Sequence, residues 1–153
     1  MQKKNAVPLT AVLAAFAALP TAVADSTPED AKDYRISVMT SLRGHVGAAS
    51  LHVRGLVDHD DGFLEKHAEG LANGAAELKH LFPAGSNVGD SEALPLIWEK
   101  PEEFAEAIDT AEEATTAFRE AVANGDRAAI GAAFRDVGTA CRGCHDRFRV
   151  DDD

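Results

Sequence analysis

The amino-acid sequence predicts an all-α protein that folds as an antiparallel, up-down four-helix bundle. Apolar residues recur at helical spacing in four segments, two of these segments open with proline followed by acidic residues, and no stretch alternates as a half-buried strand does. The chain has 153 residues, which suits one domain, and its 45% hydrophobic content is ordinary for a globular protein. Short turns on either side of one longer connection make consecutive helices antiparallel.

The first two helices are expected from Thr27 to about Leu56 and from Leu64 to Leu81. Thr27 is a favourable N-cap residue, and Pro28 suits the first helical position. The apolar stripe of the first segment consists of Val38, Met39, Leu42, Val46, Ala49, Val53 and Leu56. The stripe of the second segment consists of Leu64, His67, Ala68, Leu71, Ala75, Leu78 and Leu81.

A longer connection over residues 83–100 precedes the last two helices. It contains the only tryptophan, Trp98, which we expect to hold the connection against the bundle. The third helix opens at Pro101 and stops at Gly125, and Asp126 is the expected cap of the fourth helix. The inward stripe of the fourth helix consists of Ile130, Phe134, Val137, Cys141, Cys144, His145 and Phe148.

Residues 1–24 have the features of a secretory signal peptide. Two lysines near the start, a short apolar run over residues 11–19 and an Ala-x-Ala cleavage site ending at Ala24 follow one another. The apolar run is shorter than the roughly 20 residues that a membrane-spanning helix needs. We therefore expect an exported chain without stable membrane insertion, whose mature bundle occupies residues 25–153.

The fourth helix carries Cys141-Arg142-Gly143-Cys144-His145, a Cys-x-x-Cys-His pattern that is typical of covalent attachment of a c-type haem. The two thiols add to the haem vinyl groups as thioethers, and the histidine supplies a nitrogen to the iron. On a helix the three side chains lie at positions i, i+3 and i+4, so they project from one face.

Three other interpretations of the cysteines explain the sequence less well. A redox Cys-x-x-Cys is expected near a βαβ pattern, which is absent here. A zinc site needs about four ligands, and Cys141 and Cys144 are the only cysteines, while the other histidines are scattered along the chain. A disulfide between them would close a very short loop and add little stability.

The chain is acidic, with a formal net charge of −11. Signal cleavage would remove two lysines and no acidic residue, so the mature protein would carry −13. This charge excludes nucleic-acid binding through a basic surface. Solubility is the simpler explanation of the charge, and steering towards basic redox partners is the functional alternative.

The order of these motifs resembles the cytochrome c′ family over essentially the whole mature sequence. As in that family, the Cys-x-x-Cys-His pattern lies near the carboxyl end. The opening of the first helix (residues 28–35, PEDAKDYR) and the approach to the third helix (residues 95–98, PLIW, then Pro101 and Phe104) also resemble the family. The resemblance implies a four-helix bundle with one covalent haem c.

Site residues follow from this resemblance position by position. Cys141 and Cys144 would be the thioether anchors and His145 the proximal iron ligand. Arg149 resembles a basic residue beside the proximal face, and Arg35 resembles a first-helix arginine that pairs with a haem propionate. The alternative for each arginine is an ordinary solvated or helix-end charge.

Met39 decides the function that the resemblance implies, because it falls where the first helix faces the distal side of the iron. Family members with leucine or phenylalanine there have a five-coordinate iron that is open to nitric oxide or carbon monoxide. Members with a methionine ligand are low-spin electron carriers, since a thioether suits haem iron and raises its potential. We expect Met39 to ligate rather than only fill the core. His45 is a competing candidate, but it lies almost two turns further along the helix.

We therefore expect a periplasmic monohaem c-type cytochrome that exchanges single electrons with redox partner proteins, with His145 and Met39 as axial ligands. A gas-binding cytochrome c′ is the second hypothesis, and a haem-free helical binding module is the third. No acid–base pair, phosphate loop or nucleophile–base arrangement is apparent, so an enzymatic reaction is not expected. Family members often dimerise through their first two helices, which makes a homodimer a candidate assembly.

Overall fold

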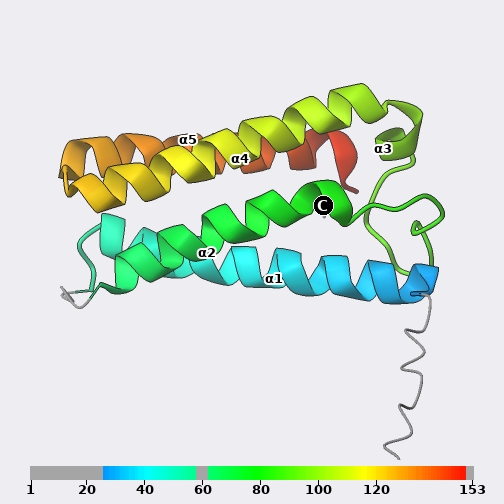
Figure 1. Ribbon diagram of the computed structural model, residues 1–153, viewed down its shortest axis with the longest axis horizontal. Helices are drawn as coiled ribbons and strands as arrows, with labels where there is room; N and C mark the ends of the chain where they lie inside the picture. The colour runs from blue at the N-terminus through cyan, green and yellow to red at the C-terminus, as the bar shows by residue number, and fades with distance from the viewer. Residues whose placement is uncertain (1–25, 58–61, 151–153) are drawn as a thin grey trace, which may run out of the picture.

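The computed structural model describes residues 26–57 and 62–150, and its four long helices form an antiparallel bundle (Figure 1). These helices are α1 (Pro28–Val53), α2 (Phe63–Glu77), α4 (Pro101–Asn124) and α5 (Arg127–Phe148). The all-α, four-helix prediction is confirmed. The predicted signal peptide lies outside the described residues. Within the described part of the chain, no helix is both long enough and apolar enough to cross a membrane.

Side-chain caps define where α1 and α5 begin. Thr27 forms a capping box with Asp30, in which the Asp30 backbone N–H donates to the Thr27 hydroxyl at 3.1 Å and the Thr27 N–H donates to the Asp30 carboxylate at 2.9 Å. Asp126 caps α5 by accepting from the Ala128 backbone N–H at 2.8 Å. Both starts agree with the sequence prediction.

Glycines in the left-handed conformation define where two helices end. Gly125 follows α4 with φ +76°, at the predicted position. Helix α1 ends at Val53, three residues before the predicted end near Leu56. Gly55 adopts φ +68° two residues after Val53, a conformation that an α-helix cannot continue.

Two hydrophobic clusters fill the bundle. The Phe104 cluster lies towards the start of α4 and consists of Ala75, Leu78, Leu81, Ile97, Phe104, Ile108, Ala111, Ala140 and Phe148. The Phe118 cluster lies towards the α4–α5 turn and consists of Ala49, Ala68, Leu71, Phe118, Val122, Ile130 and Val137. Helices α2, α4 and α5 and the connection between α2 and α4 contribute to the first cluster, and all four long helices contribute to the second.

The second helix, predicted to reach Leu81, ends as α2 at Glu77 and continues as the single 3-10 turn η1 (Leu78–His80). The connection from there to α4 contains one short helix that the periodicity did not predict, α3 (Leu96–Glu99). The Trp98 indole N–H donates to the Phe82 carbonyl at 3.1 Å, which confirms that Trp98 holds this connection in place. An isolated antiparallel bridge joins Ala93 to Arg149. The connection is therefore fixed to the end of α5, a few residues beyond the Cys-x-x-Cys-His motif.

The contacts between neighbouring helices are uneven. Helix α4 packs extensively against α5, and α2 packs against both α1 and α4. Helix α1 makes few contacts with α5. Of the four long helices, α1 and α5 are thus the neighbours that pack least closely. The Cys-x-x-Cys-His motif lies on α5, and two predicted site residues, Arg35 and Met39, lie on α1.

Candidate haem-binding site

Helix α5 brings the three residues of the Cys-x-x-Cys-His motif to its inner side. Cys141, Cys144 and His145 are all half-buried. Cys141 packs against the Phe118 cluster, and Cys144 packs against the Phe104 cluster. The motif therefore lies where the two clusters meet, and the predicted one-face arrangement is present.

Both cysteines are free thiols whose environment opposes ionisation. Burial raises the pKa of the Cys141 thiol, and burial together with Cys141 raises the pKa of Cys144 to about 11. A redox-active Cys-x-x-Cys pair instead needs a lowered thiol pKa. The site therefore does not fit a redox dithiol, and it presents two reduced thiols on one face of α5.

The imidazole of His145 is suited to iron ligation. Burial lowers its pKa, Arg149 lowers it further, and Asp146 and Glu92 act in the opposite direction. The neutral ring, which is the ligating form, is consequently favoured near neutral pH.

Arg149 lies directly beyond α5, where it has extended backbone angles and caps the helix. Its guanidinium is 4.0 Å from the Glu92 carboxylate, and its charge acts on His145. The backbone on both sides is held by the connection, because Leu94 N–H donates to the Phe148 carbonyl at 2.9 Å. Arg149 thus lies close enough to His145 for its charge to act on the imidazole, and its role beside a proximal iron ligand stays a prediction.

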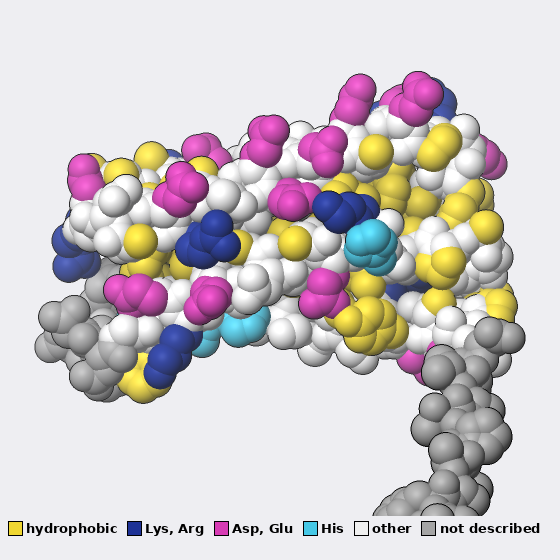
Figure 2. Space-filling view, in the orientation of Figure 1, with side chains coloured by type: hydrophobic (Ala, Val, Ile, Leu, Met, Phe, Trp, Pro, Cys, Tyr) yellow, Lys and Arg dark blue, Asp and Glu magenta, His cyan; other side chains and the backbone are white. Residues whose placement is uncertain are grey.

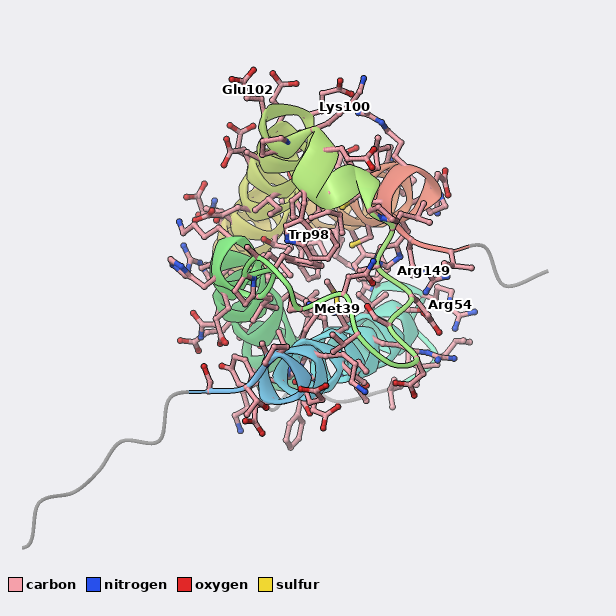
Figure 3. The ribbon with its side chains drawn as sticks, turned by 90° about the vertical axis from the view of Figure 1, so that its right-hand side faces the viewer. Met39, Arg54, Trp98, Lys100, Glu102 and Arg149 are labelled. Atoms are coloured by element: carbon pink, nitrogen blue, oxygen red, sulfur yellow. The ribbon has the colours of Figure 1, made fainter. Side chains whose placement is uncertain are left out.

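Met39 is half-buried on α1 and packs against the Phe104 cluster, the same cluster that Cys144 contacts. Figure 3 shows Met39 directed from α1 into the interior of the bundle, with Trp98 inside the same end of the bundle. The candidate distal residue and one haem anchor therefore face a common apolar region from two helices that contact each other little.

Arg35 is only 5% exposed and is used by the α2–α4 connection. Its Nη1 donates to the Leu81 carbonyl and the Ser86 hydroxyl, and its Nη2 donates to the Ser86 carbonyl and the Ser91 hydroxyl, all at 3.0 Å. The guanidinium also lies 4.9 Å from the centre of the Phe82 ring. Sequence reasoning missed this role, and the propionate contact of Arg35 stays a prediction.

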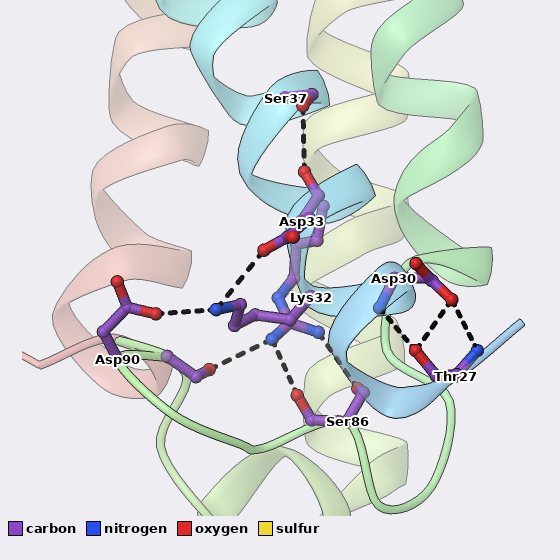
Figure 4. Close-up of polar contacts among 9 residues, drawn as sticks. Thr27, Asp30, Lys32, Asp33, Ser37, Ser86 and Asp90 are labelled. Carbon is purple, nitrogen blue, oxygen red and sulfur yellow. Dashed lines mark hydrogen bonds and ion pairs between the residues drawn. The ribbon is translucent and has the colours of Figure 1, made fainter.

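Lys32 reinforces the same attachment from the preceding turn of α1. Its ammonium nitrogen is 2.7 Å from the Asp90 carboxylate, next to the contacts at Ser86 (Figure 4). The connection is thus fastened to α1 by Lys32 and Arg35 and to α5 by its bridge at Arg149. This places a covering segment across the end of the bundle that holds the motif.

The structure corrects the view that the remaining histidines are unpaired. His45 is not near the Phe104 cluster but lies between α1 and α2, where its Nδ1 is 3.1 Å from Nδ1 of His67. Gly70 is the residue of α2 that lets the His45 ring approach, because a side chain at position 70 would clash with this ring. Among the described residues, no three histidine, cysteine or acidic side chains are grouped to hold a metal ion.

Comparisons with known proteins agree with this site. The family model described as Cytochrome C′ matches residues 30–149. Cytochrome c-554 of Cereibacter sphaeroides is 36% identical over 151 residues, which covers 95% of this chain and 98% of that protein. Cytochrome c′ of Pararhodospirillum photometricum is 33% identical over 126 residues, which covers 81% of this chain and 99% of that protein.

Solved structures of cytochromes c′ also match this chain in sequence and fold. A nitric oxide complex of a mutant cytochrome c prime from Alcaligenes xylosoxidans superposes with a TM-score of 0.76 at 30% identity, covering 82% of this chain and 98% of that one. A carbon monoxide complex of another variant of that protein gives the same TM-score and identity. With the bundle, the motif near the end of α5 and these matches in agreement, the chain belongs to the cytochrome c′ family of monohaem c-type cytochromes.

Proposed function

We propose that this chain is an exported cytochrome that carries single electrons, with its haem iron ligated by His145 and Met39. The observation that carries the proposal is that Met39 of α1 and Cys144 of α5 pack against the same hydrophobic cluster. Cys141 and Cys144 would hold the haem by thioether bonds. When bound, the haem supplies the one-electron chemistry, and the protein supplies its binding, orientation and electrostatic environment.

The side chains around the motif support this role by excluding water. Phe104 and Phe148 are at most 8% exposed and stack edge to face with ring centres 5.0 Å apart. A thioether ligand in such an apolar site raises the reduction potential, because it favours the ferrous state. Met39 would thereby keep a small-molecule ligand out and set the potential.

A second candidate function is reversible binding of nitric oxide or carbon monoxide. The similarity to solved structures of Alcaligenes xylosoxidans cytochrome c prime with bound nitric oxide and carbon monoxide favours it. In this alternative Met39 packs in the Phe104 cluster without ligating, and the distal position stays open.

Optical spectra of the purified holoprotein, oxidised and reduced, with and without carbon monoxide, distinguish the two functions. We expect a sharp low-spin spectrum that carbon monoxide does not change. Met39→Leu should convert it to a high-spin spectrum that shifts with the gas. Val38→Ala is the matched control, because Val38 neighbours Met39 and packs against the same cluster without a sulfur atom. A wild-type protein that binds carbon monoxide would establish the gas-binding function instead.

We further propose that residues 1–24 direct export to the periplasm and are removed there, leaving residues 25–153. The two lysines, short apolar run and Ala-x-Ala site support this assignment. Mass spectrometry of the holoprotein from a periplasmic extract should show a mature chain that begins at Asp25 and carries one haem. An intact amino terminus would contradict the assignment.

The acidic surface supports a basic redox protein as the partner. Glu103, Glu106, Glu113 and Asp136 line an open groove between α4 and α5 that also reaches Cys144, and Arg147 is the basic residue along it. Opposite charges accelerate encounter and are screened by salt. We expect the rate of electron transfer to a basic acceptor to fall with ionic strength. A rate that is independent of salt would argue for solubility as the only role of the charge.

A homodimer is a further proposal, which sedimentation of the holoprotein tests.

A further inference from the structure

Three histidines that the haem site does not use gather between α1 and α2. His45 and His52 come from α1 and His67 comes from α2, and all three are half-buried. The ring centres of His45 and His67 are 5.4 Å apart, and those of His52 and His67 are 6.1 Å apart. Figure 2 shows histidine side chains gathered at the lower edge of the molecule, towards the start of α2.

The closest pair has the spacing of two ligands on one metal ion. The Nδ1 atoms of His45 and His67 are 3.1 Å apart, so in the metal-free protein one of them donates a proton to the lone pair of the other. With bonds of about 2.0–2.1 Å, neighbouring nitrogen ligands in a tetrahedral or octahedral shell lie about 2.9–3.4 Å apart. A cation bound by both nitrogens would replace the shared proton and lie beside the line that joins them, with each ring turned so that its lone pair points at the ion.

Two glycines hold this pair in place. A Cβ atom at Gly70 would lie 2.5 Å from Cε1 and Nε2 of His45, so the His45 ring rests directly on the backbone of α2. One turn later, Gly74 gives the same close approach to Leu42, at 2.7 Å. The close packing of α1 on α2 places the His45 ring beside His67, and a ligand that is already positioned loses less entropy when it binds.

We propose that His45 and His67 form an accessory site that binds one divalent transition-metal ion between α1 and α2, with water in the remaining positions. Neutral imidazole suits zinc, copper and nickel. Burial lowers the pKa of His67, as do His45 and His52 to a smaller extent, so the neutral form of His67 is favoured near neutral pH. The ion would join α1 to α2 away from the haem motif, which lies on α5.

Calorimetric titration of zinc chloride into the tag-free holoprotein at pH 7.5 tests this site. We expect one zinc ion per chain, and His45→Gln or His67→Gln should weaken binding about tenfold or more. His80→Gln is the matched control, because His80 is exposed on η1 and is not among the three gathered histidines. Equal zinc binding by the wild type and both glutamine variants, or no zinc binding by the wild type, would overturn the proposal.

A second measurement uses the wild-type protein, so its outcome does not depend on whether the glutamine variants fold. In the reduced holoprotein under carbon monoxide, which is low-spin and diamagnetic whether or not Met39 ligates the iron, zinc should shift the ring-nitrogen resonances of His45 and His67 together and at one equivalent. Shifts confined to other histidines would also overturn the site. An unchanged haem spectrum during the titration is the expected sign that zinc does not act at His145.

Discussion

Helices α1 and α4 have nearly the same length but bury very different numbers of side chains. Helix α4 spans 24 residues and buries six of them along one stripe. Helix α1 spans 26 residues and buries only Arg35 and Ala49. The apolar side chains of α1 that face the bundle, among them Val38, Met39 and Leu42, are only half-buried.

The difference indicates that protein contacts alone complete the surroundings of α4 but not those of α1. Helix α1 contacts α5 little, and its apolar stripe meets the side of the bundle that carries the haem motif. A haem bound between these helices would cover that stripe and contribute apolar contacts that α4 already obtains from other side chains. The stability of α1 is therefore expected to depend on the cofactor much more than that of α4.

The largest expected effect comes from removing a buried side chain of α4. Phe118 is fully buried, so Phe118→Ala should lower the free energy of unfolding by about 3–5 kcal/mol. Ile36→Ala on the outer face of α1 is the comparison, because Ile36 is 46% exposed and should change stability by no more than about 0.5 kcal/mol. Urea unfolding followed by circular dichroism measures both. A large loss for Ile36→Ala would mean that a second molecule covers this face.

Removal of the haem should destabilise α1 more than α4. We expect amides of α1 in the haem-free Cys141→Ser, Cys144→Ser double variant to exchange at least about tenfold faster than in the holoprotein, while amides in the middle of α4 change less. Hydrogen exchange measured by mass spectrometry checks this. Equal loss of protection in both helices would show that the haem stabilises the bundle as a whole.

Two glycine variants test how closely α1 approaches α2. Gly70→Ala places a methyl group against the His45 ring and should destabilise the protein by about 1–3 kcal/mol. Gly47→Ala on α1 meets nothing within 4 Å and should stabilise it by about 0.5–1 kcal/mol, because alanine favours the helix. Thermal unfolding of the two holoproteins measures the contrast. Equal effects would contradict the close packing.

The smallest expected effect concerns the cap of α1 and depends on pH. Hydrogen bonds from the Thr27 hydroxyl and backbone N–H hold the pKa of the Asp30 carboxyl below its usual range. A lowered pKa in the folded state gives stability that is present above the usual value of about 4 and is lost as the pH falls through the folded value. Thr27→Ala should raise the Asp30 pKa towards its usual value in a carboxyl NMR titration. An unchanged pKa would show that the backbone bond alone causes the shift.

Local patterns predicted the features that depend on neighbouring residues. Thr27, Gly125 and Asp126 act as caps where the sequence placed them, and the stripe of α5 brings the haem motif inward. Each of these features is decided within a few residues, where propensity and capping rules apply.

The features that were not predicted depend on distant residues. Helix α3 is a single turn, too short for periodicity to reveal. The bond between His45 and His67 spans 22 positions, and the bonds of Arg35 span 46 to 56 positions. Only the packing of α1 against α2 and the course of the connection bring these groups together, and no spacing rule connects them.

The α2–α4 connection, which is attached to both α1 and α5, is expected to reach its final position late in folding. The bonds from Arg35 to this segment and the bridge from Ala93 to Arg149 join groups far apart in the chain, so they form only after the helices have assembled. The connection therefore takes its final course over this end of the bundle only after the helices that carry Met39 and the Cys-x-x-Cys-His motif have packed together.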